Sequence, residues 1–138
     1  VTGAGSGIGR AIARRFAAAG AHVPAPEASF YVYPDFAPLA DRLAGRHGVR
    51  TAAELSALLL DRHGVGTLPG SAFGEPPGAL RLRVATAMLY GEDDEQRLEA
   101  LASPDPVALP WIARSLDRLS EVLAGLRAPQ PALAGPVF

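Results

Sequence analysis

A strand with one apolar face most constrains how this chain of 138 residues can fold. Between residues 80 and 86 aliphatic side chains alternate with arginines and small residues, in the order Leu80, Arg81, Leu82, Arg83, Val84, Ala85 and Thr86. Successive residues of a strand point to opposite faces, so the aliphatic side chains share one face and both guanidinium groups share the other. The aliphatic face must be covered, which requires helices packed on a sheet.

The other elements are predicted from composition and apolar spacing. Two further segments have strand composition, residues 30–34 and 65–68. Five segments are predicted as helices: 8–19, 38–47, 52–62, 93–102 and 110–126. The sequence therefore predicts an α/β fold of the α+β kind, with a small antiparallel or mixed sheet, packed helices, and an N-terminal Gly-rich turn that leads into a helix.

Helix ends are marked by specific residues. Thr51 and Glu54 have the spacing of a capping box, which predicts a helix start. The pattern Arg-His-Gly-Val-x-Thr occurs at residues 46–51 and again at 62–67. Basic residues favour the negative end of a helix and glycine favours the left-handed cap, so we interpret the repeat as two helix ends rather than as a paired histidine site.

A boundary is expected near residue 24. Residues 21–23 begin like a strand, but Pro24 and Pro26 stop it, because proline cannot donate to a ladder. We therefore divide the chain into residues 1–23 and 24–138. The Pro- and Ala-rich residues 127–138 are expected to form a tail.

Composition excludes several classes of function. Arginines and carboxylates are interspersed and give a net charge of −1, which argues against a nucleic-acid surface. The absence of cysteine excludes disulfides and thiol catalysis and fits a cytoplasmic protein. No apolar run approaches the ~20 residues of a membrane helix. No metal site is expected, since the histidines are scattered and the acidic residues 92–95 suit a helix start.

The first residues, Thr2-Gly3-x-x-x-Gly7-Ile8-Gly9, resemble the cofactor loop of short-chain dehydrogenases/reductases. The resemblance implies contacts of NAD(P) with Gly3, Ser6, Gly7 and Gly9, where glycines let the backbone approach a pyrophosphate. The likeness extends over about 23 residues. No acidic residue follows at a strand end to bind the ribose.

A longer stretch, from about residue 25 to residue 126, resembles the C-terminal small domain of class I/II aminotransferases. Three segments carry this likeness: Pro26-Glu27-Ala28-Ser29-Phe30-Tyr31-Val32-Tyr33-Pro34-Asp35-Phe36, Val65-Gly66-Thr67-Leu68-Pro69-Gly70-Ser71-Ala72-Phe73-Gly74 and Leu80-Arg81-Leu82-Arg83-Val84-Ala85. The join between the two resemblances can lie anywhere between Gly9 and Pro24, because the helix between them fits both families.

The second resemblance implies that Arg81 binds the substrate carboxylate, through the planar fork of its guanidinium. Arg83 is expected to be solvated or ion-paired, and Tyr31, Tyr33 and Phe73 to be core or rim aromatics. The family holds pyridoxal phosphate on a lysine, but all thirteen basic residues of this chain apart from histidine are arginine. We therefore expect no catalytic residue and no activity from the chain alone.

The leading functional hypothesis is a truncated or fused aminotransferase fragment that recognises the carboxylate of an amino acid or 2-oxo acid. One alternative is a remnant of an NAD(P)-dependent dehydrogenase. Another is a non-catalytic interaction module. The resemblance also allows a homodimer or docking on an aminotransferase subunit.

Overall fold

The computed structural model describes residues 7–24 and 31–127. These residues form five α-helices: α1 (Ile8–Ala18), α2 (Ala40–His47), α3 (Ala52–His63), α4 (Asp94–Ala102) and α5 (Pro110–Arg127). The strands are β1 (Tyr31–Val32), β2 (Leu68–Pro69) and β3 (Leu82–Ala85). Short 3-10 turns are η1 (Ala37–Leu39), η2 (Gly70–Phe73), η3 (Thr86–Leu89) and η4 (Pro106–Ala108).

The sheet is small and antiparallel, with the order β1-β3-β2. Val32 lies opposite Val84 on one side of β3, and Pro69 lies opposite Leu82 on the other. The pairing continues beyond the strands, because Asp35 forms isolated bridges with His22 and with Arg81. The predicted α/β fold with a small sheet and packed helices is confirmed.

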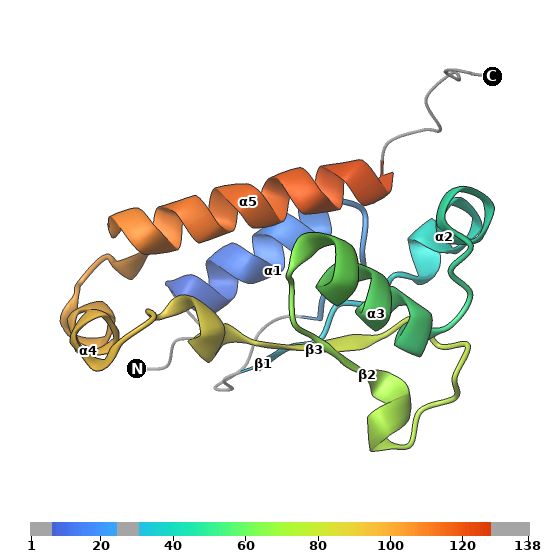
Figure 1. Ribbon diagram of the computed structural model, residues 1–138, viewed down its shortest axis with the longest axis horizontal. Coiled ribbons are helices and arrows are strands. Elements are labelled where there is room, and N and C mark those ends of the chain that lie inside the picture. The colour runs from blue at the N-terminus through green and yellow to red at the C-terminus, as the bar shows by residue number, and fades with distance from the viewer. Residues whose placement is uncertain (1–6, 25–30, 128–138) are drawn as a thin grey trace.

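The helices lie on one side of this sheet. Figure 1 shows α1 and α3 next to the strands and α5 stacked beyond α1. The inner face of β3 carries Leu80, Leu82 and Val84, all buried as the alternation predicts. Beneath the helices Phe16 and Phe36 meet edge to face, with ring centroids 5.8 Å apart. Burial of this apolar surface is the main stabilising term of the fold.

The predicted helix ends are confirmed at α2 and α3. The Glu54 N–H donates to Thr51 Oγ1 at 3.1 Å, and the Thr51 N–H donates to Glu54 Oε1 at 3.2 Å, which completes the capping box. Gly48 and Gly64 close α2 and α3 with φ of 68° and 69°. The repeated Arg-His-Gly pattern therefore has the structural role that the sequence predicts.

One local prediction was wrong. Residues 65–67 are not a strand, because the Val65 N–H donates to the Leu59 carbonyl at 2.9 Å and so belongs to the end of α3. The cap residue of α1 is Ala19, and Gly20 follows it with a φ of 104°. Residues 21–23 contribute one bridge, between His22 and Asp35, and the pairing goes no further, in line with the stop expected at Pro24.

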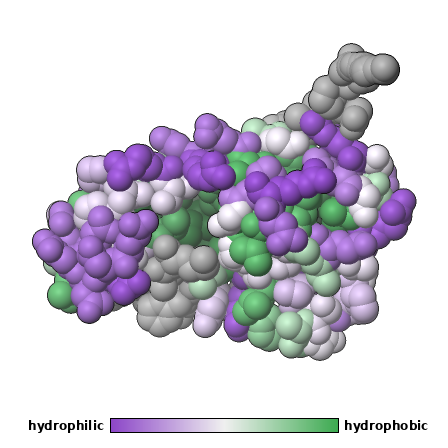
Figure 2. Space-filling model, in the orientation of Figure 1, coloured by the Kyte–Doolittle hydropathy of each residue, from purple (hydrophilic) through white to green (hydrophobic). Residues whose placement is uncertain are grey.

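Polar residues cover much of the surface, most densely over α4 (Figure 2). A cavity of about 240 Å³ lies between α1, α3, α5 and the end of β3, where Figure 2 shows an apolar recess. Within the part of the chain that the structure describes, no helix is long and apolar enough to cross a membrane. The predicted tail lies almost wholly outside the described residues.

Gly45, inside α2, and Gly48, directly after it, make a matched test of the left-handed helix end. A Cβ at Gly48 or Gly45 would meet nothing within 4 Å, but only Gly48 has a left-handed φ. Gly48→Ala should therefore lower the free energy of unfolding by about 1–2 kcal/mol. Gly45→Ala, inside the helix, should raise it by about 0.5–1 kcal/mol. Urea denaturation of both variants measures the difference, and equal effects would contradict the left-handed cap.

Candidate functional site

The face of β3 that the helices leave uncovered, called the outer face here, carries Arg81 and Arg83. Both arginines project from it because the alternate positions of the strand are buried against the helices. η2 follows β2 at one edge of the sheet, and β1 forms the other edge. The outer face is therefore bordered by side chains from both neighbours of β3.

Arg81 is held by two carboxylates of its own chain. Its Nε donates to Asp35 Oδ2 at 3.2 Å, and its Nη1 donates to Glu75 Oε1. The Arg81 side chain is nevertheless 50% exposed. Each carboxylate takes a different nitrogen, so neither of these two grips the guanidinium with both oxygens.

The two carboxylates are fixed to different degrees. Asp35 is anchored by the backbone, since its Oδ1 accepts the Ala37 N–H at 2.9 Å and its own N–H pairs with the His22 carbonyl at 2.7 Å. Glu75 is attached by one backbone bond, its N–H to the Gly70 carbonyl at 3.2 Å. A Cβ at Gly70 would lie 2.8 Å from Glu75 Oε2, so glycine there leaves room for the Glu75 carboxylate.

These partners favour the charged form of Arg81. The hydrogen bond that Arg81 donates to Glu75, followed by the one it donates to Asp35, raises the pKa of the Arg81 guanidinium above its ordinary value. Arg81 is therefore a cation with two carboxylates of its own chain beside it.

Arg83, which was expected to be solvated or ion-paired, is partly exposed and packs against two aromatic rings. Its Cζ lies 4.4 Å from the ring centroid of Tyr31 and 4.1 Å from that of Phe73. The two rings come from β1 and η2, on either side of β3. Among the described residues no carboxylate lies within ion-pair distance of Arg83, so cation–π contacts hold it. Tyr31, Tyr33 and Phe73 are exposed, and thus belong to the rim rather than the core.

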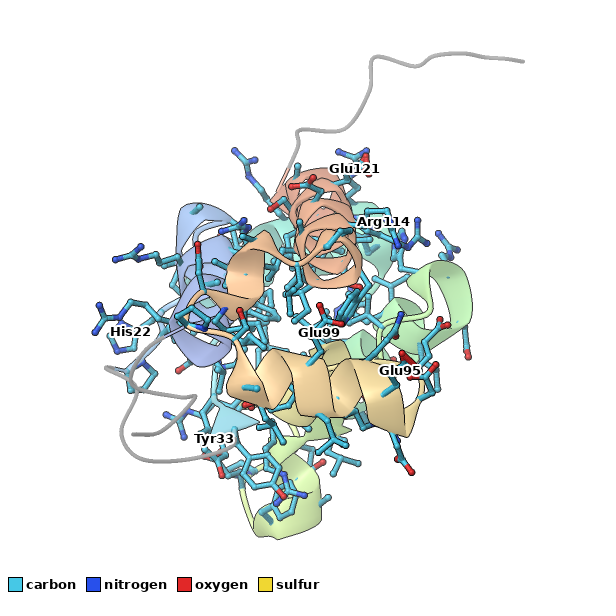
Figure 3. The ribbon with its side chains drawn as sticks, turned by 90° about the vertical axis from the view of Figure 1, so that its left-hand side faces the viewer. His22, Tyr33, Glu95, Glu99, Arg114 and Glu121 are labelled. Carbon is cyan, nitrogen blue, oxygen red and sulfur yellow. The ribbon has the colours of Figure 1, made fainter. Side chains whose placement is uncertain are left out.

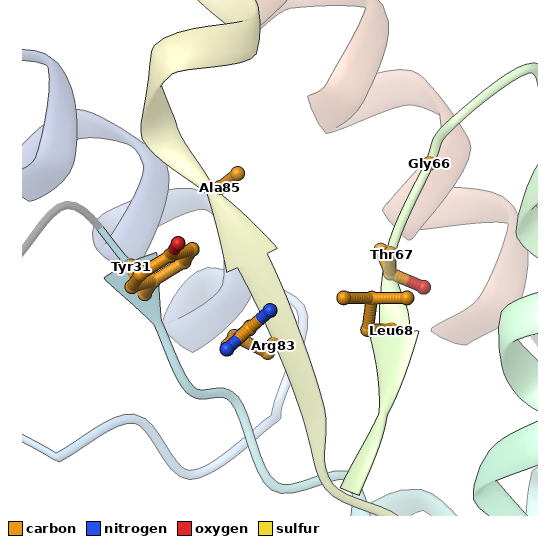
Figure 4. A pocket seen from close by; sticks show the side chains of 6 residues that line it. All are labelled: Tyr31, Gly66, Thr67, Leu68, Arg83 and Ala85. Atoms are coloured by element: carbon orange, nitrogen blue, oxygen red, sulfur yellow. The ribbon is translucent and has the colours of Figure 1, made fainter. Parts of the chain in front are cut away.

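An open pocket of about 350 Å³ adjoins Arg83 (Figure 4). It is lined by Tyr31, Gly66, Thr67, Leu68, Arg83 and Ala85. Thr67 is held in place by Ser56, which donates to the Thr67 carbonyl at 2.9 Å and accepts from Thr67 Oγ1 at 3.2 Å. The pocket combines apolar walls with one cation, which is a common composition of small-molecule sites.

The N-terminal residues expected to bind NAD(P) are not assembled into a site among the described residues. Gly3 and Ser6 lie outside the described residues. Gly7 has a φ of 64°, and a Cβ there would meet Pro106 Cγ at 3.4 Å. Gly9 is buried in α1. The strands of the described residues pair antiparallel, whereas a dinucleotide loop joins a helix to a parallel sheet.

The acidic residues of α4 have a structural role. The Gln96 N–H donates to Asp93 Oδ1 at 2.8 Å, which caps the helix. Glu95 and Glu99 lie along α4, and His22 lies on another part of the molecule (Figure 3). Within residues 7–24 and 31–127, no three His, Cys, Asp or Glu side chains are placed to hold a metal ion.

Sequence reasoning missed the partners of both arginines. The carboxylates of Asp35 and Glu75 are 46 and 6 residues from Arg81 in the chain, and only the sheet pairing brings Asp35 to it. The aromatic contacts of Arg83 depend on the register that sets Tyr31 opposite Ala85. The available signal was the concentration of aromatic residues in the two segments that border β3.

Comparison with known proteins identifies the family of the chain. The sequence model of the family "Aminotransferase class I and II" matches residues 10–101. Over 66 residues the chain is 44% identical to the probable aspartate/prephenate aminotransferase of Aquifex aeolicus. This match covers 48% of this chain and 15% of that protein. Over 71 residues it is 39% identical to the aspartate aminotransferase of Streptomyces avermitilis. This match covers 51% of this chain and 16% of that protein.

Solved structures share the fold. The aromatic aminotransferase from Pyrococcus horikoshii OT3 superposes with a TM-score of 0.51 and 22% identity, over 84% of this chain and 23% of that one. A structure described as Pyrococcus protein-A1 gives a TM-score of 0.50, also at 22% identity, over 86% and 24%. The chain thus spans less than a quarter of the length of these relatives. Because the family match extends over residues 10–101, most of the chain, this chain belongs to the class I and II aminotransferase family.

Proposed function

We propose that this chain is a truncated or fused part of an aminotransferase and supplies the substrate-carboxylate site for amino-group transfer between amino acids and 2-oxo acids. Arg81 is the anchor of that site. The observation that carries the proposal is a half-exposed guanidinium that is already bonded to carboxylates and keeps part of its fork accessible. Family membership supplies the class of reaction.

A substrate carboxylate can replace Glu75 at Arg81. Asp35 binds Nε and is fixed by the backbone, which orients the guanidinium plane. Glu75 sits at the far end of the fork in a partly exposed ion pair, a kind of contact with little net stability. A ligand carboxylate that takes both terminal nitrogens gains a second hydrogen bond that Glu75 does not make. Glu75 therefore marks the position of the substrate carboxylate.

Pyridoxal phosphate, on which the class I and II family depends in general, does not fit this chain as a covalently held group. Its attachment requires a lysine amine, and the sequence contains no lysine. The lysine and the phosphate anchors must then come from another polypeptide or segment. A homodimer, or docking on an aminotransferase subunit, is part of the proposal for this reason.

The N-terminal resemblance to dehydrogenases remains an alternative source of function through NAD(P). The family match begins at residue 10, and α1 packs on α5 within the same core as β1. Both facts favour a join near Gly9, at the early end of the range between Gly9 and Pro24. The boundary at residue 23 remains a prediction.

A non-catalytic interaction module is the second candidate, and one observation favours it. The outer face exposes a group of large apolar side chains, 36–49% accessible: Tyr31, Tyr33, Leu68 and Phe73. Apolar groups of this kind often mark binding surfaces. This candidate predicts that a partner binds these apolar side chains, and that the geometry of the Arg81 guanidinium does not affect the function.

The role of Glu75 predicts how Arg81 reacts. Glu75→Ala removes the carboxylate that contributes most to the raised pKa of Arg81, so its guanidinium should react faster with phenylglyoxal, by about twofold to fivefold, in line with a lost exposed ion pair. Peptide mass mapping measures the rate at each arginine. Arg97, paired with Asp94 at 3.3 Å, is the internal control and should not change. An unchanged rate at Arg81 would show that Glu75 does not occupy it in solution.

The absence of lysine predicts that pyridoxal phosphate forms no covalent bond with a side chain of this protein. The chain is mixed with pyridoxal phosphate, reduced with borohydride and analysed by mass. No stoichiometric side-chain adduct is expected, and an adduct on the terminal amine has no bearing on the question. A stoichiometric adduct on a side chain would contradict the proposal.

The anchor itself is tested by complementation with the lysine-bearing remainder of an aminotransferase supplied in trans. Restored transamination should fall in kcat/KM by about tenfold or more on Arg81→Lys, because a point-charge ammonium cannot make two parallel hydrogen bonds to a carboxylate. Arg114→Lys, at an exposed position of α5, is the matched control and should retain the parent rate. Equal rates for both variants would favour the interaction module over the carboxylate site.

A further inference from the structure

A second group of arginines lies on α1, away from the outer face of β3. Arg10, Arg14 and Arg15 line a hollow between α1, η4 and the first half of α5, with a volume of about 330 Å³. We call this hollow the α1 groove. Figure 1 shows α1 and α5 on the helical side of the sheet, so the α1 groove shares no lining with the outer face.

The core determines which side chains of α1 reach the groove. Ile12 and Phe16 are buried, and this fixes the rotation of α1 about its axis. Residues four apart on a helix lie one above the other, so Arg10 and Arg14 form a row. Arg15 follows directly and is partly buried, whereas Arg14 is exposed. The packing of α1 therefore holds the arginines at the groove.

The charges of Arg14 and Arg15 are not balanced by nearby carboxylates. Among the described residues that line the groove, the acidic one is Asp117, on α5. Within residues 7–24 and 31–127, no carboxylate lies within ion-pair distance of Arg14 or Arg15. Two guanidinium groups on neighbouring positions of one rigid helix thus present two positive charges to the same hollow.

The rest of the lining is largely apolar. Ala11 of α1, Val107 of η4, and Ala113 and Leu116 of α5 supply this part of the wall. The volume of about 330 Å³ falls at the lower end of the range of small-molecule pockets, about 300–1,000 Å³. The α1 groove therefore suits a ligand that combines an anionic group with a small apolar body.

The number of arginines distinguishes between possible anionic groups. A guanidinium fork binds two oxygens in parallel, so a carboxylate, which has two oxygens, is fully occupied by one arginine. A phosphate monoester has three terminal oxygens and carries a charge of about −1.5 to −2 at pH 7. It can accept hydrogen bonds from two arginines at once and balance the charge of both.

We propose that the α1 groove binds a small phosphate monoester with an apolar body. Arg14 and Arg15 hold the phosphate, and Arg10 borders it in the same row. The apolar body lies against Val107 and Ala113. This site is separate from the substrate-carboxylate site proposed above, and neither depends on the other.

The test compares three probes at low salt. Phenyl phosphate has the proposed chemistry, benzoate has the same ring but a carboxylate, and inorganic phosphate lacks the ring. The full chain, labelled with ¹⁵N, is titrated with each, and the arginine Nε–Hε signals are followed by NMR. Phenyl phosphate should shift the signals of Arg14 and Arg15 and bind about tenfold more tightly than either of the other probes.

Substitutions assign the binding to the arginines. Arg14→Gln and Arg15→Gln should each weaken phenyl phosphate binding by about tenfold, because each removes a charge-assisted hydrogen bond. Arg15→Lys keeps the charge without the planar fork and should weaken binding less than Arg15→Gln. Arg114→Gln, at an exposed position of α5 outside the lining, is the matched control and should leave the affinity unchanged.

Three results would overturn the inference. The first is benzoate or inorganic phosphate binding as tightly as phenyl phosphate. The second is parental affinity for phenyl phosphate in both Arg14→Gln and Arg15→Gln. The third is a shift of the Arg81 or Arg114 signal as large as that of Arg14, since phenyl phosphate would then bind elsewhere or without preference.

Discussion

The pleat of β3 is the constraint on which the rest of this structure depends. Leu80, Leu82 and Val84 are buried against the helices, and this alone directs Arg81 and Arg83 to the outer face. A slip of the register by one residue would bury both guanidinium groups and expose the aliphatic side chains, a change that no surface contact could offset. Packing of the core and placement of the charged site are therefore one property of the strand.

The two arginines of the outer face are held by different kinds of partner. Arg81 is oriented by Asp35 and covered by Glu75, so an incoming carboxylate exchanges one exposed ion pair for a bidentate one. Arg83 is oriented by Tyr31 and Phe73, and among the described residues no carboxylate lies within ion-pair distance of it.

Much of the fold could be predicted from the sequence, because its signals are local. The capping box at Thr51, the left-handed glycines at 48 and 64, and the alternation in β3 are each set by neighbouring residues, and the structure has all of them. The contacts of the site could not be predicted in the same way. Asp35 reaches Arg81 across 46 residues, and Tyr31 reaches Arg83 only through the register of β1 on β3. Val65 lies at the end of α3 rather than in the expected strand, because its N–H donates to the Leu59 carbonyl of that helix.

The structure of this chain in complex with glutarate is the most direct measurement of whether the outer face binds a carboxylate at Arg81. One carboxylate should lie on the terminal nitrogens of Arg81 with Glu75 displaced and Asp35 still on Nε. A complex in which Glu75 remains on Arg81 and glutarate binds away from both arginines would contradict the carboxylate-binding role of β3.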